Sequence, residues 1–154
     1  MRGFFAVGVY HPRTEANIGS LYRSASLYGA AFVFTVGQRY KTQASDTPKT
    51  PRHTPLFHFA TVADLVEHLP WSCPLVGVEL DPRAVQLPDF KHPERAAYLL
   101  GAEDHGLPPD VTDACHFLVE IPCPTAQSMN VAVAGSIVIY DRHMARSRLT
   151  AGAS

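Results

Sequence analysis

The sequence predicts an α/β fold in which a parallel sheet is covered by helices on both faces. Two observations lead to this prediction. Continuous apolar runs of strand length recur along the chain, and such runs are typical of strands buried on both faces of a sheet. Segments with helical spacing of apolar residues alternate with these runs, and that alternation favours a parallel, doubly wound arrangement.

The predicted strands are short and rich in apolar residues. They are, in chain order, FFAVGVY (4–10), AFVFTV (31–36), the short segment 56–59, LVGVEL (75–80), AAYLLG (96–101) and FLVEI (117–121). Ligands of parallel sheets bind beyond the carboxyl ends of the strands. The residues that follow these runs are therefore candidates for a binding site.

Helices are predicted between the strands. In the first one, apolar residues recur at helical spacing, and Gly29 follows where a left-handed glycine commonly ends a helix. Those apolar residues are Ile18, Leu21, Ala25 and Tyr28. A second helix is expected over residues 62–69, where Thr61 and Asp64 resemble a variant of the capping box.

Length and composition are those of one globular domain. With 154 residues, 46% of them hydrophobic, the chain can bury a sizeable core. We expect a single domain over residues 1–146 and a disordered tail over residues 147–154. The first apolar run has only the length of a strand, so no signal peptide or membrane span is predicted.

The cysteines indicate a reducing compartment. Cys73, Cys115 and Cys123 are odd in number and lack the spacing of metal ligands. The adjacent residues 103–105 (EDH) are expected on one turn, where neighbouring side chains rarely converge on one ion. We therefore expect reduced cysteines, a cytoplasmic protein and no metal site.

Basic residues concentrate in the first third of the chain. Residues 11–53 contain six basic and two acidic residues, whereas residues 54–141 contain three basic and twelve acidic ones. A phosphate-binding face on an acidic body would produce this asymmetry, and the alternative is a chance cluster in a loop. The candidate RNA-binding residues are Arg13, Arg39, Lys41, Lys49 and Arg52.

The segment 121–141, IPCPTAQSMNVAVAGSIVIYD, carries the strongest functional signal. Pro122 and Pro124 end the preceding strand, and hydroxyl and amide side chains follow before a helix begins. The first backbone N–H groups of a helix have no partner within it, so they remain available to a ligand. The arrangement suits a small polar ligand held at the edge of a sheet.

Two further segments belong with this one. NIGSLYR at 17–23 has an Asn followed six residues later by an Arg, and LGAEDHGL at 100–107 has a strand-end Gly, a Glu and a later Gly-Leu. In this order the three segments resemble the three motifs of the SPOUT (SpoU/TrmH-type) RNA ribose methyltransferases. The resemblance extends from Phe4 to Met144, nearly the whole chain.

The resemblance implies a knotted fold and a cofactor. SPOUT enzymes thread their C-terminal segment through an earlier loop and form a deep trefoil knot, which is otherwise very rare. S-adenosylmethionine lies in that knot, held mostly by backbone groups of three loops. Carried over by motif, the cofactor-binding residues here are Val78, Glu79, Leu80, Gly101, Ile121, Ser128 and Met129.

The chemistry of these residues suggests individual roles. Gly101 would let the backbone approach the ligand without a Cβ in the way. Ile121 and Met129 would offer apolar surface to the adenine, and the Ser128 hydroxyl would bond a polar group of the cofactor or loop. The Glu79 carboxylate would either accept from a ribose hydroxyl or point into solvent.

The resemblance also implies methyl transfer to a ribose 2′-hydroxyl, which must be aligned with the methyl group and lose its proton. Arg23 matches the reactive Arg of the family, but a guanidinium with a pKa above ~12 hardly releases a proton. We therefore expect Arg23 to clamp a phosphate and orient the hydroxyl. Asn17 and Asn130 would fix this geometry, and Glu103 would anchor the loop or Arg23.

The predicted protein is a homodimeric RNA 2′-O-methyltransferase in the minimal-domain form of the family. Its first and last helices would form the interface, through small residues that allow close approach: Ala132, Ala134, Gly135 and Ser136. A minimal domain favours tRNA, because rRNA-directed relatives usually carry an extra RNA-binding domain. The alternatives are an enzyme acting on rRNA, a methyltransferase acting on a base, and a non-catalytic RNA-binding module.

Overall fold

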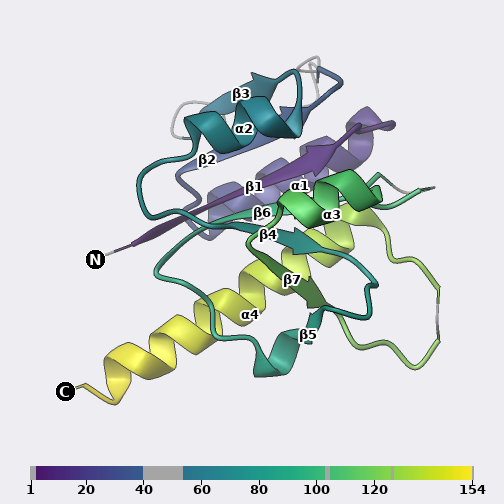
Figure 1. Ribbon diagram of the computed structural model, residues 1–154. Helices are drawn as coiled ribbons and strands as arrows, with labels where there is room; N and C mark the ends of the chain where they lie inside the picture. The colour runs from purple at the N-terminus through teal and green to yellow at the C-terminus, as the bar shows by residue number, and fades with distance from the viewer. Residues whose placement is uncertain (1–2, 40–53, 103–104, 126, 154) are drawn as a thin grey trace.

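A computed structural model describes residues 3–39, 54–102, 105–125 and 127–153. Within these ranges seven strands form one sheet, in which every neighbouring pair is parallel. The strands are β1 (Phe4–Tyr10), β2 (Phe32–Val36), β3 (Leu56–Phe59), β4 (Leu75–Val78), β5 (Val85–Gln86), β6 (Arg95–Leu100) and β7 (Phe117–Glu120). Their spatial order is β3-β2-β1-β6-β4-β7-β5 (Figure 1).

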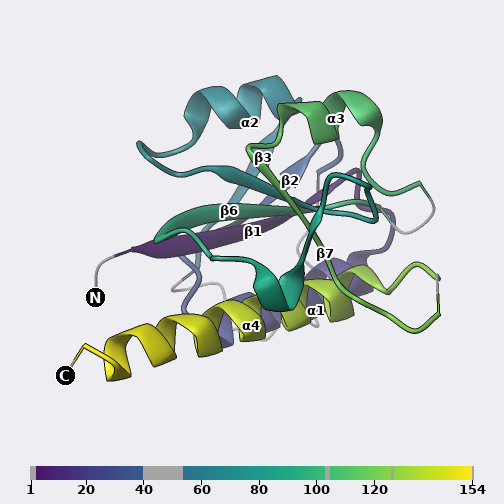
Figure 2. The same cartoon turned by 60° about the horizontal axis from the view of Figure 1, so that its bottom comes forward.

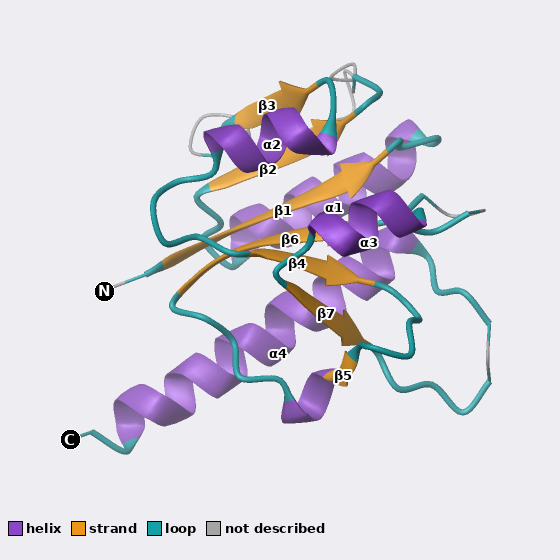
Figure 3. Ribbon diagram, viewed as in Figure 1, coloured by secondary structure: helices purple, strands orange, loops and turns teal. Residues whose placement is uncertain are grey.

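Helices cover both faces of this sheet. They are α1 (Glu15–Leu27), α2 (Val62–His68), α3 (Pro109–Ala114) and α4 (Val131–Ala151), with one 3-10 turn, η1 (Leu87–Asp89). Helices α1 and α4 lie against one face, and α2 and α3 lie against the other (Figure 2). The predicted α/β fold with a parallel sheet between two helical layers is therefore confirmed (Figure 3).

Two hydrophobic cores, one on each face, explain the continuous apolar runs. Along β6, Tyr98 and Leu100 pack toward α1 and α4, whereas Ala97 and Leu99 pack toward α2 and α3. Successive side chains of a strand point to opposite faces, so a strand covered on both sides needs apolar residues at every position. The apolar runs thus predicted the central strands to within two residues at each end.

Some details depart from the sequence pattern, and others were missed. Tyr28 continues the helical spacing of apolar residues but is exposed at the end of α1; Tyr22 is buried instead, and its hydroxyl donates to the Thr54 carbonyl. Strand β5 and helix α3 were not predicted, because a two-residue strand and a six-residue helix leave almost no periodicity.

The expected disordered tail is largely helical. Helix α4 extends to Ala151, and its last turns include hydroxyl groups that donate back to main-chain carbonyls, Ser147 to His143 and Thr150 to Ser147. Once a helix has started, each added residue gains a hydrogen bond, so α4 continues past the last core contact. No helix in the described ranges is both long and apolar enough to cross a membrane.

Strand β7 occupies an unusual place in the sheet. It pairs with β4 on one side and with β5 on the other, although both precede it in the sequence. The segment from β4 to β6 contains β5 and η1, and η1 also contacts α4. The segment from β4 to β6 thus forms a loop around the end of β7. The chain that leaves β7 passes inside this loop and then forms α4 on the face shared with α1.

A buried polar network ties α4 to the amino end of the sheet. Arg142 is only 5% exposed and donates to the Tyr98 hydroxyl as well as to the carbonyls of Phe4, Pro93 and Glu94. Arg142 is thus fully engaged inside the protein, and it is not available to phosphate.

His92 is part of the same network. Its Nδ1 lies 2.6 Å from the Tyr98 hydroxyl, and its Nε2 lies 2.8 Å from the Asp141 carboxylate. Because the Asp141 carboxylate can only accept, Nε2 of the neutral ring is the donor, and Nδ1 accepts the proton of the Tyr98 hydroxyl. Burial lowers the pKa of His92, against the opposing effect of Asp141.

The His92 network predicts a loss of stability in mild acid. Because the pKa of His92 in the folded protein is below the usual 6.5, the unfolded chain takes up a proton on His92 at a higher pH than the folded protein does. The free energy of unfolding is therefore highest above pH ~6.5 and declines as the pH falls toward the folded-state pKa. His92→Leu should lower the free energy of unfolding by about 1–3 kcal/mol at pH 7.5, because Tyr98 and Asp141 lose a hydrogen-bond partner. The variant should also lose less stability than the wild type as the pH falls. Urea unfolding between pH 7.5 and 5 measures both effects.

The matched control is His68→Gln on α2. A hydrogen bond to the Asp64 carbonyl raises the pKa of His68, so this histidine contributes stability that appears as the pH falls. In His68→Gln the free energy of unfolding should therefore decline in acid as steeply as in the wild type, or slightly more steeply. An acid decline of the same slope in His92→Leu and wild type would contradict the assignment.

Candidate functional site

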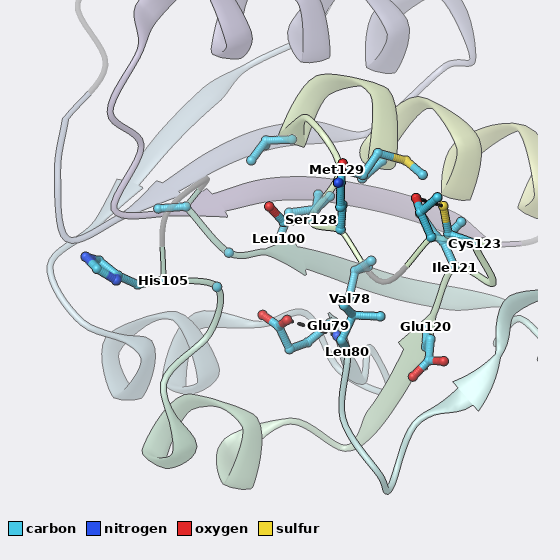
Figure 4. A pocket seen from close by; sticks show the side chains of 17 residues that line it. Val78, Glu79, Leu80, Leu100, His105, Glu120, Ile121, Cys123, Ser128 and Met129 are labelled. Carbon is cyan, nitrogen blue, oxygen red and sulfur yellow. Dashed lines mark hydrogen bonds between the residues drawn. The ribbon is translucent and has the colours of Figure 1, made fainter.

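A cavity of about 610 Å³ opens at the carboxyl ends of β4, β6 and β7 (Figure 4). Its walls come from the residues after β4, the residues after β6, and the segment that runs from the end of β7 into the first turn of α4. Pockets of 300–1,000 Å³ at the strand ends of parallel sheets are typical binding sites for small molecules. The cavity is the right size and in the right place for a nucleoside-sized ligand.

The residues expected to bind a cofactor all line this cavity. They are Val78, Glu79, Leu80, Gly101, Ile121, Ser128 and Met129. They come from three segments that are distant in the sequence. The parallel sheet brings them together because the carboxyl ends of neighbouring parallel strands share one edge.

The cavity also contains residues that the motifs did not single out. His105 and Glu120 line it, and the Glu120 carboxylate accepts from the Gln86 amide at 2.8 Å. Cys123 lines it as well, and hydrogen bonding to Thr125 lowers the pKa of this thiol. Glu120 is the last residue of β7, and Cys123 and His105 lie three and five residues beyond strand ends. These positions were the available signal, since such residues meet at one edge of the sheet.

Polar and apolar groups occupy different parts of the cavity wall. Ile121 and Met129 are partly buried and pack against the core beneath α4, so they present apolar surface. Thr125, Gln127 and Ser128 are exposed and add hydroxyl and amide groups. Such a wall can hold a flat apolar ring and hydrogen-bond the polar parts attached to it.

Gly101 has a structural role in addition to the one expected toward the ligand. A Cβ there would lie 2.3 Å from the Gly106 carbonyl carbon and 2.7 Å from the Leu107 nitrogen. The tight turn after β6, closed by the hydrogen bond from Gly106 N to Ala102 O, therefore requires glycine at position 101. A side chain at this position would distort the turn that forms part of the cavity wall.

The Glu79 carboxylate is engaged with the protein's own backbone. One oxygen accepts from the Leu80 N–H at 2.9 Å, and the other accepts from the Leu107 N–H at 2.6 Å. These contacts were not expected from the sequence, and the bond to a ribose hydroxyl stays a prediction. The carboxylate links the segment after β4 to the turn after β6.

The two asparagines of the motifs form a direct bridge. Asn130 caps α4, because its side-chain oxygen accepts from the N–H groups of Ala132 and Val133. Its amide then donates to the Asn17 oxygen at 3.0 Å, and the Asn17 amide donates to Thr14 at 2.6 Å. The start of α1 and the start of α4 are thereby joined beside the cavity, as expected for residues that fix a common geometry.

The remaining predicted residues are more scattered. Arg23 is exposed on α1 and does not line the cavity. Arg13 and Asn17 line a small hollow that shares Ala102 and Val131 with the main cavity. Arg39 is exposed beyond β2. Glu103, Lys41, Lys49 and Arg52 lie outside the described residues.

One group of side chains in the described part of the chain lies close enough together to hold a metal ion. It consists of Asp64, Glu67 and His68 on α2. The Asp64 carboxylate already accepts from the Ala60 N–H, and His68 bonds the Asp64 carbonyl, so the group serves the local structure of the helix. None of its members lines the cavity.

Comparisons with known proteins agree with this geometry. The sequence is 28% identical over 135 residues to the 23S rRNA (guanosine-2′-O-)-methyltransferase RlmB of Acinetobacter baylyi, which covers 81% of this chain and 53% of RlmB. The fold matches the A. aeolicus TrmH/SpoU tRNA modifying enzyme with a TM-score of 0.83 at 20% identity, over 95% of this chain and 77% of that one.

A third match has a bound ligand. The SpoU methyltransferase AviRb from Streptomyces viridochromogenes, solved in complex with the cofactor AdoMet, matches with a TM-score of 0.76 at 25% identity. The match covers 97% of this chain and 59% of AviRb. The chain spans about half the length of RlmB and of two other curated relatives.

The similar structures also bear on the knot. They imply that the segment after β7 is knotted, which agrees with the position of β7 inside the loop from β4 to β6. The predicted SPOUT fold is therefore confirmed. The profile of the SpoU rRNA Methylase family matches residues 5–140, and the chain belongs to this family.

Proposed function

We propose that this protein transfers a methyl group from S-adenosylmethionine to a ribose 2′-hydroxyl of RNA. The observation that carries the proposal is the cavity at the ends of β4, β6 and β7, which contains all seven residues that the family motifs indicate for the cofactor. Two relatives support it, since RlmB is a guanosine-2′-O-methyltransferase and AviRb binds AdoMet.

The cavity has the chemistry that this cofactor requires. A volume of about 610 Å³ accommodates a nucleoside with an amino-acid side arm. Ile121 and Met129 offer apolar contact to an adenine ring, and Ser128 offers a hydroxyl to the polar parts. The cofactor supplies a methyl group that its sulfonium activates. The protein's contribution is then to bind the cofactor and to present the acceptor hydroxyl.

The acceptor side is assigned to the start of α1 and the start of α4. Asn17 and Asn130 hold each other through a 3.0 Å hydrogen bond next to the cavity, so they can fix the local geometry of an approaching ribose. Arg23 would clamp a phosphate and orient the hydroxyl, because a guanidinium keeps its proton and has a planar set of donors. Glu103 would anchor the turn after β6 or Arg23.

The proposed substrate is tRNA, bound through the basic part of the chain. The likeness to the TrmH/SpoU tRNA modifying enzyme supports tRNA, while RlmB supports rRNA as the alternative. The proposed phosphate contacts are Arg13, Arg39, Lys41, Lys49 and Arg52. We place the reaction in the cytoplasm, consistent with three free cysteines.

We further propose that the protein is a homodimer, with an interface on α1 and α4. Val133 is 50% exposed, Tyr140 is 54% exposed, and Ile137 lies between them on the same side of α4. Leu27 at the end of α1 is 78% exposed. Four large apolar side chains on adjacent helices form a surface that a second copy would remove from water.

The small residues of α4 do not form this surface, contrary to the expectation from sequence. Ala132, Ala134 and Gly135 are buried within the chain, and a Cβ at Gly135 would lie 2.4 Å from the Leu21 side chain. Ser136 is hydrogen-bonded to Ser24 at 2.8 Å. These small residues let α4 approach α1 and the sheet closely, whereas the larger residues of α4 point outward.

Methyl transfer tests the proposed activity. The wild-type protein should transfer labelled methyl groups from S-adenosylmethionine to tRNA, with the product identified as a 2′-O-methylnucleoside by mass spectrometry. Arg23→Ala should lower turnover by about 100-fold, because the hydroxyl is no longer held in line, with cofactor affinity nearly unchanged. Arg23→Lys should rescue it poorly, since an ammonium lacks the planar fork.

Lys91→Ala is the control, because it removes one exposed positive charge outside the cavity. Its turnover should match that of the wild type. Transfer to rRNA alone would select the alternative substrate, and methylation of a base would reject the ribose assignment. Cofactor binding without transfer to any RNA would leave a non-catalytic RNA-binding module.

Sedimentation tests the proposed interface. The wild type should sediment as a dimer, and Ile137→Asp should sediment as a monomer, because dimerisation would bury an unpaired carboxylate. Val66→Asp on α2 is the control, since Val66 is also an exposed apolar residue but lies on the other face of the sheet. A dimeric Ile137→Asp variant would mean that the interface lies elsewhere.

A further inference from the structure

One residue, Glu79, is bonded to all three of the strand ends that surround the cavity. Its backbone N–H donates to the Val119 carbonyl in β7 at 3.0 Å. Its carboxylate accepts from Leu80 after β4 at 2.9 Å and from Leu107 after β6 at 2.6 Å. Figure 4 shows the Glu79 side chain at the cavity wall, with the bond to Leu80 dashed.

The turn after β6 is shaped to receive this carboxylate. Gly106 has a φ of +60°, and a Cβ built on it would lie 2.2 Å from a Glu79 carboxylate oxygen. Glycine is therefore required at position 106 both by its left-handed backbone and by the close approach of Glu79. Gly101 in turn packs on Gly106, so the carboxylate supports the backbone that forms one wall of the cavity.

The contacts require a carboxylate in particular. Both partners of the side chain are backbone N–H donors, and an ionised carboxylate accepts through two oxygens, with stronger bonds than a neutral group forms. An amide of the same size has one oxygen and one NH2 group. Glutamine at this position would satisfy one N–H and turn a donor toward the other.

Because each oxygen is bonded to a different segment, the side chain can act on a ligand through the segments that it connects. The residues on either side of these bonds line the cavity: Val78 at the end of β4 and Leu80 after it, and Gly101, Ala102 and Gly106 after β6. The distance between the segment after β4 and the turn after β6 is therefore the width available to a cofactor.

We propose that Glu79 is a positioning residue that sets the width of the cofactor cavity by holding the turn after β6 against the end of β4. The inference rests on the proposed function, because it takes S-adenosylmethionine as the ligand. It changes the role of Glu79 from a cofactor contact to the residue that preorganises backbone groups for that cofactor.

Glu79→Gln tests the inference directly. S-adenosylmethionine binding measured by calorimetry should weaken at least about tenfold, which corresponds to about 1.4 kcal/mol. The KM for the cofactor should rise in parallel, while the KM for RNA stays within about twofold of the wild type. Glu79→Asp should not restore affinity, because its carboxylate is one methylene too short to reach both N–H groups. Restoration by Glu79→Asp would indicate a purely electrostatic effect on the cofactor and overturn the proposal.

Two controls separate positioning from general stability. Glu67→Gln makes the same substitution at an exposed site on α2 and should bind as the wild type does. Thr61→Ala removes the hydroxyl that caps α2, so it should lower the melting temperature without changing cofactor affinity. A Thr61→Ala variant that weakens binding as much as Glu79→Gln does would overturn the proposal, because stability alone would then explain the effect.

Amide hydrogen exchange of the wild type provides an independent measurement. Cofactor binding should slow exchange at Leu107, whose N–H lies on the Glu79 carboxylate, and should leave the helix α2 amides unchanged. Unchanged exchange at Leu107 on binding would overturn the proposal even if Glu79→Gln did not fold. Failure of the wild type to bind S-adenosylmethionine would overturn the proposed function itself, whereas equal binding by wild type and Glu79→Gln would overturn only the role of Glu79.

Discussion

The site depends on the position of β7 inside the sheet. Strand β7 is the last to occur in the sequence, yet it hydrogen-bonds to β4 on one side and to β5 on the other. Its place between earlier strands brings the chain that leaves it directly beside the ends of β4 and β6. The segment from Ile121 to Met129 then closes the cavity, and α4 begins there. A β7 at the sheet edge would leave the cavity without this wall.

Hydrogen bonds between main chain and side chains preserve this arrangement on both sides of the cavity. On one side the Glu79 carboxylate joins the ends of β4 and β6, and the Glu79 backbone N–H bonds to β7. On the other, the Asn130 side chain starts α4 and bonds to Asn17 at the start of α1. Each of these side chains satisfies backbone N–H groups at an element's end, where regular secondary structure provides no partner. The cavity is thus shaped before any ligand enters it.

Helix α4 has separate tasks along its length and around its circumference. Its first turn lines the cavity, its small residues pack on α1 and the sheet, and Arg142 binds carbonyl groups at the opposite end of β1 and β6. The outward residues Val133, Ile137 and Tyr140 remain for a second copy of the chain. One helix therefore takes part in the cavity, in the packing against the sheet and in the proposed interface.

The sequence by itself determined the central strands and, through the family motifs, seven of the residues that line the cavity. Burial of both sheet faces demands apolar residues at every position, and parallel strands collect their carboxyl ends at one edge. Only the tertiary structure decided why Gly101 is a glycine, what Glu79 binds and which side of α4 is exposed. These features depend on contacts between segments tens of residues apart, such as Glu79 with Leu107, and local patterns contain no record of such partners.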